Sequence, residues 1–147
     1  RCADLEFVIA GDGPLRSDVI QASQELENLR YEGWLSRPQL VAEMDACDAL
    51  VLPSQVESFG NVALEAMARG RIAVVTETCG IVNWSRLAEP LVSFPLADSL
   101  ADVLERLSAS PEADLIERSE DSHRSALALN NASLDQWLRI LERHTRS

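Results

Sequence analysis

The sequence predicts an α/β protein in which parallel strands form an open, doubly wound sheet, followed by a helical C-terminal tail. Short apolar runs alternate along the chain with segments that repeat apolar residues at helical spacing. The run at 72–76 (IAVVT) is rich in β-branched residues, which is typical of a strand covered on both faces. Glycine or proline separates most of these segments. Helices between parallel strands imply right-handed crossovers.

The first half of the chain gives two strand–helix units. The apolar run 5–10 (LEFVIA) predicts a buried strand, which ends at the turn 11–14 (GDGP) and precedes a helix over 15–26. A weaker strand is expected over 29–32. The helix after it begins at Ser36, because Ser36 and Gln39 have capping-box spacing and proline follows in the first turn.

The central segment predicts a strand, a short helix and a second strand. The run 49–52 ends at Pro53, and residues 61–69 form a helix. Gly70 suits the left-handed position just after a helix. The strand 72–76 follows directly.

The last third is predominantly helical. A short strand is expected at 91–94, followed by a helix that Asp98 caps and that runs to Ala109. A further helix begins at Pro111 and reaches residue 129. Asn130 and Asn131 then predict a break before a last amphipathic helix, which the capping-box pair Ser133 and Gln136 would start.

Composition excludes several classes of function. The net charge of −11 argues against nucleic-acid binding and against a polybasic membrane patch. No apolar run is long enough to span a membrane. The three cysteines show no close pairing and the two histidines no metal-ligand spacing, so we expect reduced thiols, a cytoplasmic location and no bound metal.

Two glutamates form the most informative feature, in the stretch 53–70 (PSQVESFGNVALEAMARG). Glu57 lies in the loop after a strand, and Glu65 lies in a helix whose other residues are nearly all apolar. Such a helix is buried, so the carboxylate of Glu65 is expected to be away from water and to need a hydrogen-bonding partner. The partner is either an arginine (Arg69, Arg71 or one elsewhere) or a ligand.

Ligands of open α/β sheets bind at the carboxyl ends of the strands. The candidate loops there are 11–14, 33–36 and 53–60. The third leads directly into a helix, so its outward N–H groups and the helix dipole favour a phosphate. With Glu65 accepting ribose hydroxyls and Glu57 accepting those of a second sugar, the segment describes a nucleotide-sugar diphosphate site.

The run 53–76 resembles the E-x7-E signature of the retaining glycosyltransferases of family 4, formerly called group 1. The runs VIAGDGP and YEGWLSRPQLVAEMDACDALVLPS resemble further blocks of that family in the same order. The resemblance covers roughly residues 5–110. It implies a GT-B fold, in which two Rossmann-like domains face each other across a cleft.

The resemblance also implies roles for individual residues. Glu57 matches a glutamate near the reacting centre, and is the expected catalytic residue. Glu65 matches the glutamate that holds the ribose. The remaining donor-binding residues are those of the turn that holds sugar and diphosphate, those beside the base, and the glycine turn of the first strand: Ser58, Phe59, Gly60, Asn61 and Val62; Trp34 and Leu35; and Gly11.

By this resemblance, residues 1–147 are one partial domain, the C-terminal nucleotide-sugar-binding half of the enzyme, with 111–147 as its helical tail. The acceptor domain and the upstream basic residues are expected to lie outside the chain, which alone would not turn over. The full-length protein would transfer a sugar from a UDP- or GDP-linked donor to a glycan or lipid-linked acceptor. It would need no cofactor or metal, and would be cytoplasmic or membrane-peripheral.

The sequence departs from the family after Thr76, where a Gly-Gly-x-x-Glu pattern is usual. One glycine, Gly80, is kept and the glutamate is missing. Two alternatives therefore stay open: a non-catalytic, degenerate GT-B module that binds a nucleotide sugar or a partner protein, and a different GT-B enzyme such as an epimerase or phosphorylase. Trp84 is interpreted as a core or interface residue rather than a ligand contact.

Overall fold

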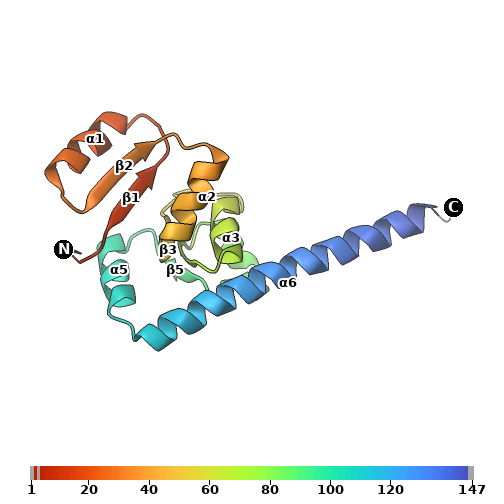
Figure 1. The fold of residues 1–147 in the computed structure, drawn as a ribbon. Coiled ribbons are helices and arrows are strands. Elements are labelled where there is room, and N and C mark those ends of the chain that lie inside the picture. The colour runs from red at the N-terminus through yellow and green to blue at the C-terminus, as the bar shows by residue number, and fades with distance from the viewer. Residues whose placement is uncertain (1, 3, 146–147) are drawn as a thin grey trace.

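The computed structural model describes residue 2 and residues 4–145. Strands and helices alternate through the first two thirds of the chain, and a long helix ends it (Figure 1). The elements are β1 (Phe7–Ala10), α1 (Arg16–Glu25), β2 (Leu29–Gly33), α2 (Arg37–Ala46), β3 (Ala49–Leu52), α3 (Asn61–Ala68), β4 (Ile72–Thr76), the 3-10 turn η1 (Gly80–Asn83), α4 (Ser85–Ala88), β5 (Val92–Phe94), α5 (Leu100–Ser108) and α6 (Glu112–Thr145).

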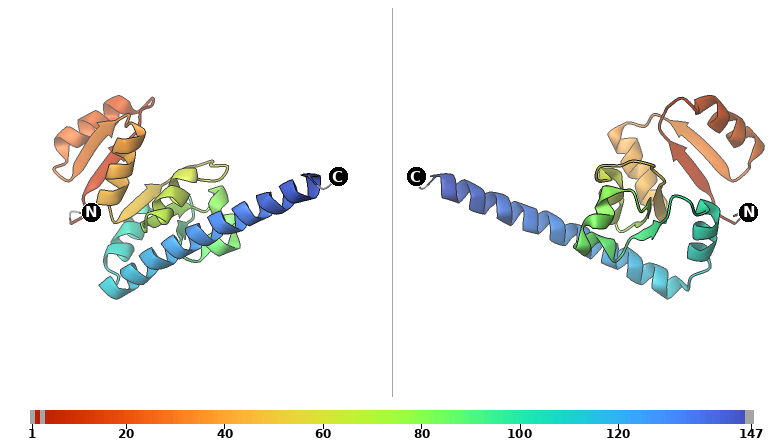
Figure 2. Two further views of the ribbon diagram at one scale, coloured as in Figure 1. Left: turned by 45° about the vertical axis from the view of Figure 1, so that its right-hand side comes forward. Right: turned by 180° about the vertical axis from the view of Figure 1, so that it is seen from behind.

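All strand pairs are parallel, which confirms the predicted class, but the strands lie in two hydrogen-bonded sheets. β1 pairs with β2, and β3, β4 and β5 form the second sheet in that order. Figure 2 shows the β1–β2 pair, with α1, to one side of the three-stranded sheet. The sequence predicts one open sheet. In the structure β1 and β3 are not paired with each other, so the sheet is divided in two.

The expectation that the first strand is buried is wrong. The side chains of Val8 and Ile9 are 41% and 38% exposed, because β1 has a hydrogen-bonded neighbour on one side only. β4 lies between two strands, and all five of its residues are buried. Both strands are apolar, so the sequence predicts burial for both. Their place in the sheet made the difference.

The core lies on the two faces of the three-stranded sheet. One cluster joins Ala73 and Val75 of β4 to Met67 of α3. The other joins Val74 of β4 to Val103 and Leu104 of α5. Partly buried residues of both sheets, Phe7 of β1 and Val51 of β3 among them, pack against this second cluster. Alternating strand side chains therefore supply both faces, as expected for a parallel sheet.

Three of the predicted helix ends are confirmed by the structure. Gln39 Oε1 accepts the N–H of Ser36 at 3.0 Å, which forms the capping box that starts α2. Gly70 has a φ of 70° just past α3, and α6 begins after Pro111. The cap of α5 is Ser99 and not Asp98, one residue later than expected. Boundaries of this kind depend on local hydrogen bonds that sequence spacing fixes only to within a residue or two.

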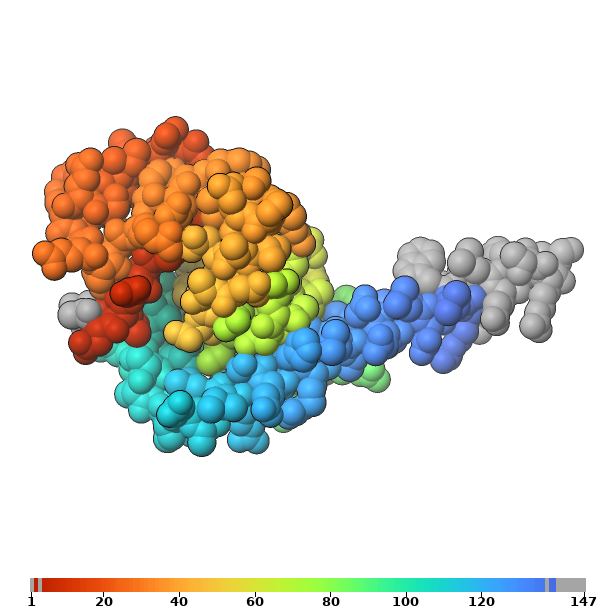
Figure 3. All heavy atoms as spheres, viewed as in Figure 1, coloured from red at the N-terminus to blue at the C-terminus, as the bar shows by residue number. Residues whose placement is uncertain are grey.

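The predicted break at Asn130–Asn131 is wrong, because α6 continues from Glu112 to Thr145. Ser133 and its capping-box partner therefore lie inside the helix. Asparagine is a weak helix former rather than a helix breaker, so two of them do not end a helix whose other residues favour it. Leu134 and Leu138 are 55% and 57% exposed, and this part of α6 extends away from the body of the molecule (Figure 3).

The first half of α6 packs on α3 and closes the end of that helix. Ser119 Oγ donates a hydrogen bond to the carbonyl oxygen of Gly70 at 2.6 Å, and His123 Nδ1 lies 2.7 Å from the carbonyl oxygen of Ala68. These contacts satisfy carbonyl groups that the end of α3 leaves without helical partners. No helix among the described residues is both long and apolar enough to cross a membrane.

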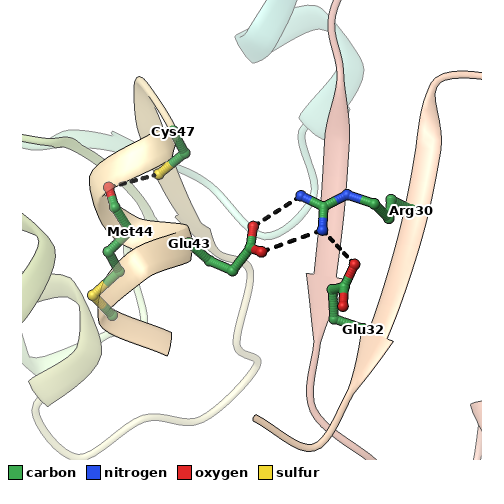
Figure 4. A network of polar contacts seen from close by, with 5 residues as sticks. All are labelled: Arg30, Glu32, Glu43, Met44 and Cys47. Atoms are coloured by element: carbon green, nitrogen blue, oxygen red, sulfur yellow. Dashed lines mark hydrogen bonds and ion pairs between the residues drawn. The ribbon is translucent and has the colours of Figure 1, made fainter. Parts of the chain in front are cut away.

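An arginine on β2 ties the smaller sheet to α2 (Figure 4). The Arg30 guanidinium donates to both carboxylate oxygens of Glu43, at 3.2 and 2.9 Å, and also contacts Glu32. Hydrogen bonding to Arg30 lowers the pKa of the Glu43 carboxyl, and the two carboxylates raise the pKa of Arg30. A second surface pair, Asp45 with Arg69, links α2 to the end of α3.

Candidate functional site

Glu57 lies in the turn between β3 and α3, and its carboxylate caps that turn. Glu57 Oε1 accepts the N–H of Phe59 at 3.3 Å and the N–H of Gly60 at 3.2 Å. The side chain is partly buried, so these two bonds hold one carboxylate oxygen in a fixed place. The second oxygen, Oε2, accepts no hydrogen bond from the described residues. Glu57 is therefore oriented by its own loop and keeps one oxygen for another group.

The backbone of this turn is bound to the segment after β4. The N–H of Gly80 donates to the carbonyl oxygen of Glu57 at 2.9 Å, and the N–H of Ile81 donates to that of Phe59 at 2.7 Å. Cys79 Sγ also donates to Phe59, at 3.3 Å. An isolated parallel bridge joins Glu57 and Cys79. The pairing of β3 with β4 thus continues past both strands into the loops.

The start of the same loop is held by two threonines. Thr76 Oγ1 and Thr78 Oγ1 both donate to the carbonyl oxygen of Ser54, at 2.5 and 2.9 Å. Thr76 is fully buried at the end of β4. Residues 54–60 are therefore held at both ends by Thr76, the last residue of β4, and by the residues that follow it. The position of Glu57 thus depends on the fold.

Two glycines make this arrangement possible. Gly60 has a φ of 98°, a region that favours glycine, and a Cβ added there would lie 2.6 Å from Cys79 Sγ. A Cβ at Gly80 would lie 2.0 Å from the carbonyl oxygen of Ser58. The backbones of the two loops are thus closer than any side chain would allow.

The start of α3 has fewer free N–H donors than the sequence predicts. The N–H groups of Phe59 and Gly60 are taken by Glu57. Those of Asn61 and Val62 have no acceptor among the described residues, and the first turn of α3 contains no acidic side chain. Helix N-termini attract anions through such groups and through the helix dipole. Ser58 is exposed beside them.

Glu65 is less buried than the sequence predicts. Its side chain is 34% exposed, and Glu65 Oε1 lies 2.9 Å from Arg37 Nη1. The expectation of a carboxylate away from water is wrong, because one side of α3 faces α2 rather than the core. Its partner is one of the alternatives that the sequence left open, an arginine elsewhere in the chain. Oε2 accepts no bond from the described residues.

The Arg37–Glu65 pair also brings the second candidate loop to the third. Arg37 is the first residue of α2, and Trp34 and Leu35 lie just before its cap Ser36, in the loop after β2. Trp34 is 82% exposed, which is rare for so large an apolar side chain, and Leu35 is partly buried. The loop predicted to lie beside a base is therefore tied through Arg37 to the glutamate predicted to hold a ribose.

Gly11 lies next to that second loop. Its N–H donates to the carbonyl oxygen of Gly33 at 2.6 Å, and its own carbonyl oxygen accepts the hydroxyl of Tyr31 at 2.9 Å. These bonds join the carboxyl ends of β1 and β2, but the structure gives no direct contact between Gly11 and either glutamate.

Trp84 packs against the turn of Glu57. Its ring meets that of Phe59 edge-to-face, with 5.5 Å between centroids and 79° between planes, and Trp84 is 49% exposed. Trp84 is therefore not a core residue, and its interpretation as an interface residue stays a prediction. Its exposed part lies at the edge of the candidate site.

Several residues of this site were not found from the sequence. Arg37, Cys79 and Thr78 each contact residues 20 or more positions away in the chain. Only their positions in the sequence could have indicated them. Thr78 and Cys79 follow the carboxyl end of β4, and Arg37 begins the helix that follows β2. No group of three or more potential metal ligands occurs in the part of the chain that the structure describes.

Comparison with known proteins places the chain in a family. Residues 1–110 match the model of the family described as glycosyl transferases group 1. A 2-deoxystreptamine glucosyltransferase of Streptomyces kanamyceticus is 33% identical over 111 residues, which are 69% of this chain and 29% of that protein. A GDP-mannose-dependent alpha-(1-6)-phosphatidylinositol dimannoside mannosyltransferase of Mycobacterium tuberculosis is 28% identical over 137 residues, 92% of this chain and 33% of that protein.

Solved structures show the same fold at lower identity. Sucrose-phosphate synthase from Thermosynechococcus elongatus superposes with a TM-score of 0.75 at 19% identity, over 100% of this chain and 47% of that one. HepE from Anabaena, solved in complex with UDP-glucose, gives 0.68 at 16% identity, over 93% of this chain and 42% of that one.

The fold is that of an α/β domain of the kind found in GT-B glycosyltransferases. The chain belongs to the group 1 glycosyltransferase family. It spans 29 to 33% of the length of the two curated relatives named above.

Proposed function

We propose that this chain is the donor-binding, C-terminal part of a retaining glycosyltransferase of family 4, and that the full-length protein transfers a sugar from a nucleoside diphosphate sugar to a glycan or lipid-linked acceptor. The observation that carries the proposal is the capped turn at Glu57. It presents a fixed carboxylate at the start of a helix whose next two N–H groups are free, within a sequence that matches the family.

In this proposal Glu57 and Glu65 have separate tasks. Glu57 Oε1 is held by two N–H groups, so Oε2 accepts hydroxyls of the transferred sugar. Glu65 accepts the two ribose hydroxyls, with Oε2 free and Oε1 shared with or released by Arg37. Trp34, which is 82% exposed, provides the apolar surface beside the base. The donor is expected to be UDP- or GDP-linked, since one relative is named for GDP-mannose and one similar structure was solved with UDP-glucose.

The proposed reaction forms a bond between an acceptor oxygen and the anomeric carbon and breaks the bond from that carbon to the phosphate oxygen. The nucleoside diphosphate leaves with the electron pair, and one of its phosphate oxygens takes the proton that the acceptor hydroxyl loses. The N–H groups of Asn61 and Val62, with the dipole of α3, stabilise the charge on the leaving phosphate. The proposed reaction uses no metal ion and no cofactor.

The Arg37–Glu65 ion pair favours one alternative, a non-catalytic module. Glu65 already has a partner in Arg37, so its carboxylate needs no ligand to satisfy it. Under this alternative the pair is structural, and removing either residue changes stability and leaves nucleotide-sugar binding unchanged.

The proposal is tested by calorimetry and turnover assays on the full-length protein with UDP-, GDP- and ADP-sugars. Glu65→Gln is expected to weaken binding of the free nucleoside diphosphate, while Glu57→Gln leaves it nearly unchanged and lowers turnover by about 100-fold or more. Glutamine keeps the shape of each side chain, which limits indirect effects on folding.

Glu89→Gln is the matched control, since Glu89 lies at the end of α4, outside the candidate site. Wild-type binding of nucleotide sugars by both site variants would contradict the assignment. Binding without turnover in the unsubstituted protein, with every acceptor class tried, would support the non-catalytic module.

A further inference from the structure

The outer edge of β5 has backbone groups without a hydrogen-bond partner. β5 pairs with β4, and no strand among the described residues pairs with its other side. The carbonyl oxygen of Phe94 accepts the N–H of Glu77, so the backbone groups of Phe94 face the side of β4. Successive residues of a strand direct these groups to opposite sides. The N–H and the carbonyl oxygen of Ser93 therefore face outward, with no partner in the part of the chain that the structure describes.

An open hollow of about 240 Å³ lies along this edge, and its wall includes residues 92–95. α5 packs on one face of the three-stranded sheet, with Val103 in one core cluster. α6 packs on the other face, with Ala126 in the second cluster. Each helix supplies an arginine to the hollow, Arg106 from α5 and Arg118 from α6. The unpaired amide of Ser93 thus shares the hollow with two guanidinium groups.

Neither arginine has a carboxylate partner among the described residues. Arg118 Nη1 donates to the carbonyl oxygen of Pro90 at 3.1 Å, which holds its guanidinium near the start of β5. The side chain of Arg106 has no hydrogen-bond acceptor in the described chain, whereas Arg30 and Arg37 both pair with glutamates. Two like charges in one hollow repel each other, and an anion bound by both offsets that repulsion.

Asp98 also lines the hollow, but it belongs to the opposite end of β5. Its N–H donates to the carbonyl oxygen of Pro95, in the turn after the strand, while Arg118 is held at Pro90, before the strand. A strand advances about 3.3 Å per residue, so residues 90 and 95 lie on the order of 15 Å apart. Arg106 lies in the last turn of α5, which also places it away from Asp98. The arginine end of the hollow therefore keeps its positive charge.

The donors reach this end from an edge strand and from helices on both faces of the sheet. Arginine binds phosphate and carboxylate groups through charge-assisted hydrogen bonds. A planar carboxylate accepts donors mainly in one plane, whereas a tetrahedral phosphate accepts them from several directions. The volume of about 240 Å³ is below the roughly 300–1,000 Å³ of sites for drug-sized ligands, so the ligand is small. An added peptide strand fits less well, because the three-residue β5 offers the outward groups of Ser93 alone.

We propose that this hollow binds the phosphate group of a small molecule, whose oxygens accept hydrogen bonds from the N–H of Ser93 and from the guanidinium groups of Arg106 and Arg118. None of these residues belongs to the candidate site, so the inference goes beyond the proposed function. Its test needs no nucleotide sugar.

The test is a titration of the full-length protein with inorganic phosphate at constant ionic strength, followed by NMR of individual amides. The Ser93 amide signal is expected to shift and to saturate. The amides of Asn61 and Val62 report phosphate at the candidate site, so the failure of one site is distinguishable from the failure of the other. A Ser93 signal that stays in place, that shifts without saturating, or that shifts equally with acetate would overturn the proposal.

A parallel titration with glycerol phosphate separates two sources of the phosphate group. Tighter binding than that of inorganic phosphate identifies a phosphomonoester as the ligand, and weaker binding identifies free phosphate. Both results support the site.

Arg106→Gln is the decisive variant, because the side chain of Arg106 makes no hydrogen bond or ion pair in the described chain and its loss leaves the fold intact. It is expected to raise the dissociation constant of phosphate, measured at Ser93, by about tenfold or more, the effect of one lost hydrogen bond from a charged group. Arg124→Gln is the matched control, since Arg124 is also exposed but lies further along α6, outside the hollow. Unchanged phosphate binding in Arg106→Gln, or an equal loss in both variants, would contradict the inference.

Discussion

Arg37 Nη1 lies 2.9 Å from Glu65 Oε1, although the two residues are 28 positions apart in the chain. This pair joins the start of α2 to the middle of α3. It connects the helix that follows the loop of Trp34 to the helix that follows the turn of Glu57. Because Arg37 is 67% exposed and Glu65 34% exposed, the pair is open to water and contributes little to stability.

The role of Arg37 is therefore best seen in ligand binding. Arg37→Gln frees Glu65 Oε1 but removes the group that orients it, so we expect weaker binding of the nucleoside diphosphate, by a smaller factor than in Glu65→Gln. Calorimetry on the full-length protein measures both. Arg124→Gln is the matched control, because Arg124 is 63% exposed and also pairs with carboxylates, but lies on α6. Equal effects of the two arginine variants would show that only net charge matters.

Gly60→Ala is expected to destabilise the fold by about 2 kcal/mol or more. A left-handed conformation costs a residue with a Cβ about 1–2 kcal/mol, and contact with Cys79 adds to this. Gly13→Ala is the control, because nothing lies within 4 Å of a Cβ there. Urea unfolding gives both values. In a Cys79→Ala background the cost at Gly60 should fall, since the contact at 2.6 Å is removed. An unchanged cost would show that backbone strain alone acts.

The Glu43 and Asp45 carboxyls make stability depend on acid pH. Hydrogen bonds from Arg30 and Arg69 lower their pKa values below the ordinary 4.5 and 3.8. Their contribution is therefore complete above those ordinary values and is lost as the pH falls through the lowered ones. We expect the melting temperature of Glu43→Gln to fall less than that of the wild type between neutral pH and pH 3.

Because the Arg30–Glu43 pair is open to water, with side chains 53% and 29% exposed, the difference is small, and it should disappear in an Arg30→Gln background. A difference that persists without Arg30 would assign the effect to another partner of Glu43.

Asn131→Ala distinguishes a continuous α6 from two helices with a break. Asn131 is exposed within the helix, so alanine should stabilise it by about 0.5 kcal/mol and leave or raise the helical signal in circular dichroism. At a break, asparagine would satisfy backbone groups, and its replacement would lower stability. A loss of helicity in Asn131→Ala would therefore contradict the continuous helix.

Local pattern predicted much of this molecule. The order of strands and helices, the capping box at Ser36 and the helix end at Gly70 all follow from spacing and from the conformational preferences of single residues. The same kind of reasoning placed Glu57 in a turn and Glu65 in the following helix. It failed at Asn130 and Asn131, where a mild preference against helix was outweighed by the residues on either side.

The tertiary structure alone decided how exposed these elements are and which residues meet. The partner of Glu65, the fit of Gly60 against Cys79 and the interruption between β1 and β3 all join segments distant in the sequence. Apolar composition is the same for a strand with two neighbours and a strand with one, so the sequence could not separate β4 from β1. Burial depends on what lies on each side of an element, and only the folded chain brings those sides together.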